Sequence, residues 1–150
     1  MAERVLVTGG ASGIGRAVAE RCRAEGYEPV VIDREAPPGS SIIAADLSDP
    51  AQTGAALAEA LREGPITRLV NNVGIVRPGA LEEQTLTDFE IATSLNLRCA
   101  MQCAQALLPG MKDAGFGRIV NMASRAALGK ELRTVYAATK AGLIGMAKVW

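Results

Sequence analysis

The spacing of Tyr136 and Lys140 suggests acid/base chemistry. Both lie in TVYAATKAGL (134–143), and residues four apart share one face of a helix, so a phenol would lie beside an ammonium group. A phenol with an ordinary pKa near 10 must shift by roughly three units, or about 4 kcal/mol, to act as a base near neutrality. A positive charge about 4 Å away, at an effective dielectric constant near 20, supplies an interaction of that order. The pair predicts a proton-exchanging tyrosine, against the alternative of two surface residues at chance spacing.

The composition narrows which groups can transfer protons. The 150 residues contain no histidine, which excludes histidine-based triads and histidine metal sites and leaves Tyr, Lys, Asp, Glu and Cys. Cys22, Cys99 and Cys103 lack metal-ligand spacing, and we interpret Cys99 and Cys103 as small buried residues. We therefore predict no metal and a reducing, cytoplasmic compartment.

Charge and hydropathy exclude two classes of partner. Lys+Arg and Asp+Glu both total 16, and no segment gathers a basic stripe, so we expect no nucleic acid. No apolar run approaches the roughly 18–20 residues that span a bilayer, so we expect no membrane. The opening MAERVLVTGG lacks the pattern of a signal peptide.

Short apolar runs alternate with helical patterns along the chain. We predict strands at 4–9, 29–33, 41–46, 67–72 and 117–124, and helices at 12–26, 50–64, 85–115 and 134–150. Strands that are apolar throughout, separated by helices, predict a single α/β domain over 1–150: a doubly wound parallel sheet, the Rossmann fold.

Several local features qualify this outline. Ile14, Ala17, Val18 and Cys22 share one face of the first helix, which should stop near Gly26. The 34–41 connection is too short and too rich in Pro and Gly for a helix, so we expect a loop or a single turn.

The end of the chain also departs from a complete fold of this type. Pro109 should kink the long helix or mark its last turn. The last helix runs into Trp150 without a stop signal, and a doubly wound sheet usually has a sixth strand that would cover the fifth. We therefore expect a fold that lacks its final strand or strands and helix, and a natural chain that continues beyond these residues.

The segment VTGGASGIG (7–15) predicts a phosphate-binding turn. Gly9, Gly13 and Gly15 lie between a strand and a helix, where glycine allows a tight turn, close approach of a pyrophosphate and close helix packing. The helix N-terminus would then present unpaired N–H groups to the phosphates. In this context the glycines predict a dinucleotide site, whereas a glycine string alone indicates only a turn.

Asp33 bears on the choice of cofactor. It ends the second strand, where a carboxylate accepts hydrogen bonds from the adenosine ribose and repels the additional phosphate of NADP. Arg34, the next residue, would have the opposite effect. The position of Asp33 favours NAD over NADP. The alternative interpretation is that Asp33 is only a carboxylate in a surface turn and binds no cofactor.

These motifs resemble those of the short-chain dehydrogenase/reductase family, in its main single-domain branch. The resemblance covers the whole chain and rests on TGGASGIG (8–15), ADL (45–47), NNVG (71–74), SLNL (94–97), NMAS (121–124) and YAATK (136–140). Val73 departs from the family's usual alanine, which should crowd the strand without removing function. The cofactor-binding residues that the resemblance implies, besides those above, are Ser12, Ile14, Asp46 (on the adenine amino group), Leu47, Asn72, Gly74, Tyr136 and Lys140.

The resemblance also implies catalytic roles. Tyr136 would be the general acid/base, and Lys140 would lower its pKa and bind the nicotinamide ribose. Ser124 would hold the reacting oxygen, although a serine there is more often a cap, and Asn96 would organise a water that links Lys140 to solvent. Independently of the resemblance, Arg125, Lys130 and Arg133 lie between Ser124 and Tyr136 and would favour a polar or anionic substrate. The alternative is that these cations are solvated or lie at a subunit contact.

The expected function is an NAD(H)-dependent oxidoreductase that interconverts a secondary alcohol and a ketone. The alternatives are an NADPH-dependent reductase of beta-ketoacyl-carrier-protein type and a dinucleotide-binding module without turnover. We expect the 150 residues alone to bind NAD weakly and turn over little. By resemblance we expect a homodimer or homotetramer, with contacts from the long helix at 96–113 and the Tyr136 helix.

Overall fold

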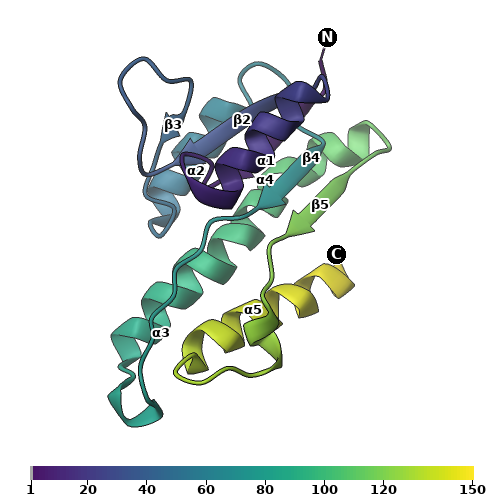
Figure 1. Cartoon of the computed structure of the whole chain (residues 1–150). Coiled ribbons are helices and arrows are strands. Elements are labelled where there is room, and N and C mark those ends of the chain that lie inside the picture. Colours follow the sequence, from purple (N-terminus) through teal and green to yellow (C-terminus); the bar gives the residue numbers. More distant parts are fainter. Residues whose placement is uncertain (1) are drawn as a thin grey trace.

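Strands and helices alternate along residues 2–150, which the computed structural model describes (Figure 1). The strands are β1 (Arg4–Thr8), β2 (Glu28–Asp33), β3 (Ile43–Ala44), β4 (Arg68–Asn71) and β5 (Arg118–Asn121). The α-helices are α1 (Gly13–Ala24), α2 (Pro50–Ala60), α3 (Leu86–Thr93), α4 (Cys99–Asp113) and α5 (Thr134–Val149). A π turn (Ser94–Arg98) joins α3 to α4, and short 3-10 turns lie at Leu81–Glu83 and Arg125–Leu128.

The strands form a parallel sheet in the order β3-β2-β1-β4-β5. Leu6 in β1 pairs with Val30 in β2 and with Leu69 in β4, so β1 lies at the centre. The strand order reverses between β1 and β4, and the carboxyl ends of strands at such a point form a crevice suited to ligands. The predicted doubly wound parallel sheet is confirmed.

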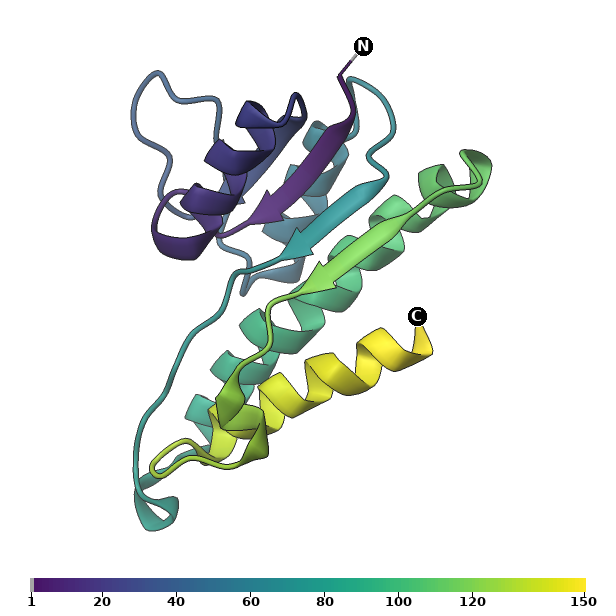
Figure 2. The ribbon, with the colours of Figure 1, turned by 45° about the vertical axis from the view of Figure 1, so that its right-hand side comes forward.

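Helices cover both faces of the sheet. α1 lies on one face, while α2 and α4 lie on the other (Figures 1 and 2). The core between the sheet and α2 and α4 contains Leu6, Ile32 and Leu69 from the strands, with Leu57 and Leu107 from the helices, all at most 2% exposed. α5 packs against α3 and the π turn, beside β5.

The long helix predicted at 85–115 is interrupted. The structure divides it into α3, the π turn and α4, because residues 94–98 follow the wider π hydrogen-bond pattern. Pro109 lies inside α4, about one turn before the helix ends at Asp113. The third strand is shorter than predicted: only Ile43–Ala44 pairs with β2. As expected, the 34–41 connection contains a single turn, closed by a hydrogen bond from Ser40 N to Pro37 O (3.0 Å).

The predicted buried face of α1 is partly wrong. Gly15 and Ala19 are the buried residues, with Val18 and Cys22 half-buried, whereas Ile14 is 64% exposed and Ala17 is exposed. The close approach of Gly15 to the turn before it rotates the helix toward that side. Gly26 stops the helix as predicted, with a φ of 83°.

The cysteines behave as small buried residues within α4. Cys99 and Cys103 are 1% and 0% exposed, and their sulfur atoms lie 4.0 Å apart. The contact with the Cys99 thiol, together with burial, raises the pKa of Cys103 and keeps the Cys103 thiol protonated. None of the helices within residues 2–150 has the length and the apolar character needed to cross a bilayer.

Candidate active site

The glycine-rich turn brings segments of backbone into close contact. Gly9 follows β1 with a φ of 69°, a left-handed conformation that glycine adopts without strain. A Cβ atom on Gly15, in the first turn of α1, would lie 2.1 Å from the Gly9 carbonyl oxygen and 2.5 Å from Asn72 Nδ2. Any side chain at Gly15 would therefore push α1 away from the end of β1.

The start of α1 offers hydrogen-bond donors. Ser12 precedes the helix, and within the described structure its side chain makes no capping hydrogen bond and the first helical turn carries no acidic residue. Gly13 and Ile14 are exposed there. The first N–H groups of a helix have no partner inside it and lie at the positive end of its dipole, so an anionic group such as a pyrophosphate fits this position.

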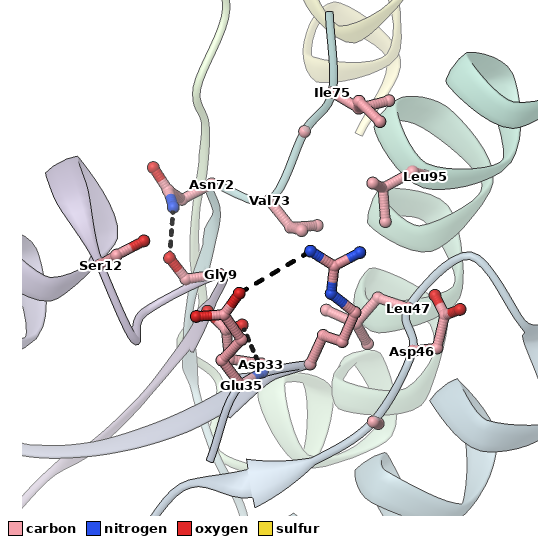
Figure 3. Close-up of a pocket in the computed structure, with 13 residues that line it drawn as sticks. Gly9, Ser12, Asp33, Glu35, Asp46, Leu47, Asn72, Val73, Ile75 and Leu95 are labelled. Atoms are coloured by element: carbon pink, nitrogen blue, oxygen red, sulfur yellow. Dashed lines mark hydrogen bonds and ion pairs between the residues drawn. The ribbon is translucent and has the colours of Figure 1, made fainter. Parts of the chain in front are cut away.

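A cavity of about 350 Å³ opens beside this turn (Figure 3). Strands β1, β2 and β4 contribute to it at or just after their carboxyl ends. It combines residues from both halves of the sheet. The predicted cofactor residues in its lining are Gly9, Ser12, Asp33, Arg34, Asp46, Leu47, Asn72 and Gly74. The other predicted cofactor residues lie outside the lining: Gly13, Ile14 and Gly15 at the start of α1, and Tyr136 and Lys140 on α5.

Asp33 and Arg34 place two opposite charges in the cavity wall. The carboxylate of Asp33 accepts hydrogen bonds from Ala11 N (2.9 Å) and Glu35 N (3.0 Å). These contacts leave lone pairs that can accept from ribose hydroxyl groups. The Arg34 guanidinium lies 3.8 Å from Glu35 and remains largely exposed. The pair therefore contains one group suited to a ribose and one suited to a phosphate.

Asp46 is held in the ionised form. Ser48 donates to its Oδ1 through both its hydroxyl (2.6 Å) and its backbone N–H (2.9 Å), and these bonds lower the pKa of the Asp46 carboxyl group. A charged carboxylate at this wall can accept a hydrogen bond from an amino group. Leu47, which follows it, is buried and also lines the cavity.

Thr8 and Asn72 join the ends of β1 and β4. Thr8 Oγ1 accepts from the backbone N–H groups of Asn72 (3.1 Å) and Val73 (3.2 Å). In return, Asn72 Nδ2 donates to the carbonyl groups of Thr8 and Gly9, both at 3.0 Å. Figure 3 shows the bond to Gly9. The two side chains thereby hold the glycine-rich turn against the segment that follows β4.

Gly74 connects the cavity to the acid/base residues. A Cβ atom there would lie 3.3 Å from Lys140 Nζ and 3.3 Å from Asn96 Oδ1. A side chain at this position would displace one of those groups. The nucleotide cavity and the α5 lysine are therefore neighbours, separated by one glycine.

Tyr136 and Lys140 lie on the same face of α5, as predicted. Lys140 Nζ is 5.6 Å from the centre of the Tyr136 ring, and the lysine is only 4% exposed. Its ammonium group donates to the Met122 carbonyl oxygen at 2.6 Å. Burial lowers the pKa of Lys140. The structure thus puts a cation with little solvation beside a phenol.

Asn96 lies in the π turn and is 1% exposed. Its Oδ1 accepts from Ile75 N (2.8 Å), and its Nδ2 donates to Ile75 O (3.0 Å) and to Thr139 Oγ1 (3.0 Å). Asn96 therefore ties the segment after β4 to the α5 residue directly before Lys140. One lone pair of Oδ1 remains available.

Ser124 follows β5 and caps a 3-10 turn. Its Oγ accepts from Ala126 N at 3.1 Å, and the turn packs against α5. Ser124 lines a separate hollow together with Arg125 and Lys130, which are both exposed. Arg133 lies beside Gly79 in an isolated bridge between backbone segments.

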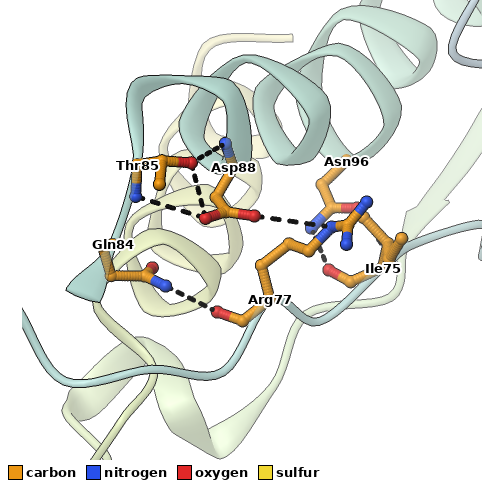
Figure 4. A network of polar contacts seen from close by, with 6 residues as sticks. All are labelled: Ile75, Arg77, Gln84, Thr85, Asp88 and Asn96. Carbon is orange, nitrogen blue, oxygen red and sulfur yellow. Dashed lines mark hydrogen bonds and ion pairs between the residues drawn. The ribbon is translucent and has the colours of Figure 1, made fainter.

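Sequence reasoning missed several residues that shape the site. Glu35, Ala45, Ile75 and Leu95 line the cavity, although none of them was predicted as a site residue; Ala45 and Leu95 lie within the ADL and SLNL motifs. Ile75 also belongs to a group of polar contacts shown in Figure 4. In this group Asp88 lies 3.8 Å from Arg77 Nε, and its carboxylate accepts hydrogen bonds from the backbone N–H and the hydroxyl of Thr85, the residue that caps α3. Ile75 follows NNVG directly, so adjacency to that motif was the available signal.

The chain matches the family model for short chain dehydrogenases over residues 3–150. It is 37% identical to the 3-oxoacyl-[acyl-carrier-protein] reductase MabA of Mycobacterium avium, over 96% of this chain and 58% of that protein. It is 35% identical to D-threitol dehydrogenase of Mycolicibacterium smegmatis, over 96% of this chain and 61% of that protein. The chain spans about three fifths of the length of these curated relatives.

A solved structure shows the same arrangement. A blue fluorescent protein from a metagenomic library, in complex with NADPH, superposes with a TM-score of 0.87 at 35% identity. The match covers 96% of this chain and 65% of that one.

Proposed function

The chain belongs to the short-chain dehydrogenase family, and from that premise we propose that it acts as an NAD(H)-dependent oxidoreductase, which interconverts a secondary alcohol and a ketone. The observation that carries the proposal is the position of Lys140. Its buried ammonium group lies 5.6 Å from the centre of the Tyr136 ring and borders Gly74 of the nucleotide cavity. A dinucleotide-holding scaffold alone has no need of a poorly solvated cation beside a phenol.

The donor set of this chain fits a dinucleotide. The open start of α1 suits the pyrophosphate, Asp33 suits the adenosine ribose, and Asp46 suits the adenine amino group. Ile14 lies at the exposed start of the same helix, and Leu47, Asn72 and Gly74 complete the wall. A bound nicotinamide would supply the hydride chemistry.

The residues of this chain would transfer the proton and stabilise the phenolate left by that transfer. The Tyr136 hydroxyl exchanges a proton with the substrate oxygen, and the Lys140 ammonium group stabilises the phenolate that forms. Asn96 holds the residue before Lys140 and keeps one lone pair for a water molecule. Ser124 Oγ donates to the same substrate oxygen while it still accepts from Ala126 N, because a hydroxyl group can donate one hydrogen bond and accept others.

The preference for NAD rests on Asp33, whose carboxylate disfavours an additional phosphate on the ribose. Titration of the protein with NADH and NADPH tests it: we expect NADH to bind more tightly, and Asp33→Asn to reduce the difference. Tighter binding of NADPH by the unmodified protein would contradict the assignment.

Arg34 supports the second candidate, an NADPH-dependent reductase of the beta-ketoacyl-carrier-protein type. Its guanidinium group lines the cavity, where it could bind a ribose phosphate, and it is largely exposed. One relative, MabA, is a 3-oxoacyl-[acyl-carrier-protein] reductase, and another related protein was solved in complex with NADPH. In that case Arg34→Ala would weaken NADPH binding and leave NADH binding unchanged.

We further propose that the protein is a cytoplasmic homodimer or homotetramer. Three free cysteines support a reducing compartment. Exposed apolar side chains on α4 and α5, including Met101 and Ile144, support contacts between copies through these helices.

A further inference from the structure

Arg98 connects the π turn to the loop that precedes α2. It is the last residue of the π turn and is half-buried. Its guanidinium group donates to the Ser48 carbonyl oxygen through Nη2 and to Ser94 Oγ through Nη1, the latter at 3.2 Å. A planar guanidinium can reach two such acceptors at once, whereas a lysine ammonium acts as a point donor.

Ser48 passes this restraint on to Asp46. Its hydroxyl and its backbone N–H both donate to Asp46 Oδ1, at 2.6 Å and 2.9 Å. Asp46 lines the nucleotide cavity, whereas neither Ser48 nor Arg98 belongs to the lining. Arg98 therefore acts on the cavity through the serine, and the orientation of the carboxylate depends on where that serine is held.

The same π turn also reaches the other half of the site. Leu95 lines the cavity, and Asn96 holds Ile75 and Thr139. Because π turns space side chains differently from a regular helix, neighbouring residues of this turn reach separate structures. The turn is thus a common support for the adenine side and for the acid/base side.

A simple brace would not require an arginine here. Gln102, one turn further along, already ties α4 to the start of α2 by donating to the Pro50 carbonyl oxygen at 2.8 Å. Arg98 in addition leaves its Nε buried without a hydrogen-bond partner among the described residues, which is unfavourable. A tether between α2 and α4 alone therefore does not account for an arginine at this position.

We propose that Arg98 is a positioning residue for dinucleotide binding, which holds Ser48 so that the Asp46 carboxylate faces the adenine half of the ligand. The proposal rests on the proposed function, because it assigns the carboxylate to an adenine amino group. Its effect should be confined to the adenosine half of the ligand.

Arg98→Met tests this prediction with two ligands. The dinucleotide, NADH or NADPH, whichever the unmodified protein binds more tightly, should bind roughly tenfold more weakly. Reduced nicotinamide mononucleotide, which lacks the adenosine half, should bind as it does to the unmodified protein. Lys112→Met removes the same charge from an exposed position of α4 and should change neither affinity. Arg98→Lys, which keeps the charge without the fork, should give an intermediate loss and serves if the methionine variant fails to fold.

Hydrogen exchange in the ligand-free protein separates this proposal from the proposed function. The Ser48 amide should exchange faster in Arg98→Met and Arg98→Lys than in Lys112→Met. If the unmodified protein binds no dinucleotide, the proposed function fails. The adenine assignment of Asp46 and the proposal for Arg98 then fail as well, even if the Ser48 amide exchanges faster in the Arg98 variants. If dinucleotide binds but the Ser48 exchange rate is unchanged, or both ligands weaken equally, the proposal for Arg98 alone is overturned.

Discussion

At the scale of single residues, the site depends on how the α5 phenol and its cation are held. Lys140 is buried and donates to one backbone carbonyl group, so its position is restrained, and no carboxylate within residues 2–150 forms an ion pair with it. A cation in that state favours a neighbouring phenolate more strongly than a solvated one would. Substitutions at these two positions should therefore affect turnover much more than folding.

Removing the phenol oxygen tests the proposed acid/base role. Tyr136→Phe should reduce turnover by roughly 10²–10⁴-fold, the usual contribution of a positioned acid or base. The ring still packs, so the affinity for NADH and the unfolding temperature should stay near those of the unmodified protein. Steady-state rates, ligand titration and thermal unfolding measure the three quantities.

Tyr27→Phe is the matched control. Tyr27 stacks on Arg68 (5.1 Å) at the other end of the sheet, and its ring is kept in the variant. We expect unchanged turnover. Equal losses in the two variants, or an active Tyr136→Phe protein, would show that Tyr136 does not transfer the proton.

Lys140 should make stability depend on alkaline pH. Because burial lowers the pKa of Lys140 in the folded state, the unfolded chain binds more protons between the folded pKa and the ordinary one. The free energy of unfolding should therefore rise with pH in that window and level off above the ordinary value. Lys140→Met should lack this rise, as measured by urea unfolding at successive pH values. Lys148→Met removes a lysine from an exposed site on the same helix, and a loss of the rise there would refute the attribution.

At the scale of elements, the junction of β1, α1 and β4 is the most constrained part of the site. The backbone at Gly15 lies directly against the Gly9 carbonyl group and the Asn72 side chain, which leaves no room for a Cβ atom at Gly15. This packing explains why α1 buries Gly15 and Ala19 and leaves Ile14 exposed beside the predicted phosphate position.

Two glycine-to-alanine substitutions should have opposite effects. Gly15→Ala forces a Cβ to within 2.1 Å of the Gly9 carbonyl oxygen, and it should destabilise the protein by about 2–4 kcal/mol and weaken NADH binding. Gly145→Ala adds a Cβ with no atom within 4 Å and should stabilise α5 by up to about 1 kcal/mol. Denaturant unfolding measures both, and a stable, NADH-binding Gly15→Ala protein would contradict the close packing at this junction.

The elements also show what local patterns could and could not predict. Apolar strands and the glycine spacing at 9, 13 and 15 are local signals, and they predicted the parallel sheet and the turn beside the cavity. The π turn at 94–98 makes hydrogen bonds with Ile75 and Ser48, which are far away in sequence, whereas helical periodicity is a local signal and predicted one continuous helix. The positions of Leu95 and Arg98 could not be predicted for the same reason.

At the scale of the whole molecule, the net charge and an exposed apolar surface on α4 and α5 both favour contact between copies. The net charge is zero, so long-range repulsion between copies is small. Leu97, Met101 and Met146 meet in a mainly apolar hollow between α4 and α5, and Ile144 is exposed on the same helix as Met146. An apolar face that spans two helices is a suitable contact between copies.

A charge placed in this hollow tests the proposed self-association. Met101 is 42% exposed, so Met101→Glu should leave folding intact and reduce the mass in solution toward that of one chain, because association would remove a charged carboxylate from water. Light scattering coupled to gel filtration measures the mass. Leu86→Glu, at an 83% exposed position outside the hollow, should leave the mass unchanged. If the unmodified protein is a monomer, or if Met101→Glu does not reduce the mass, α4 and α5 do not form the contact. The NADH affinity of the same samples would show whether ligand binding in the cavity depends on association.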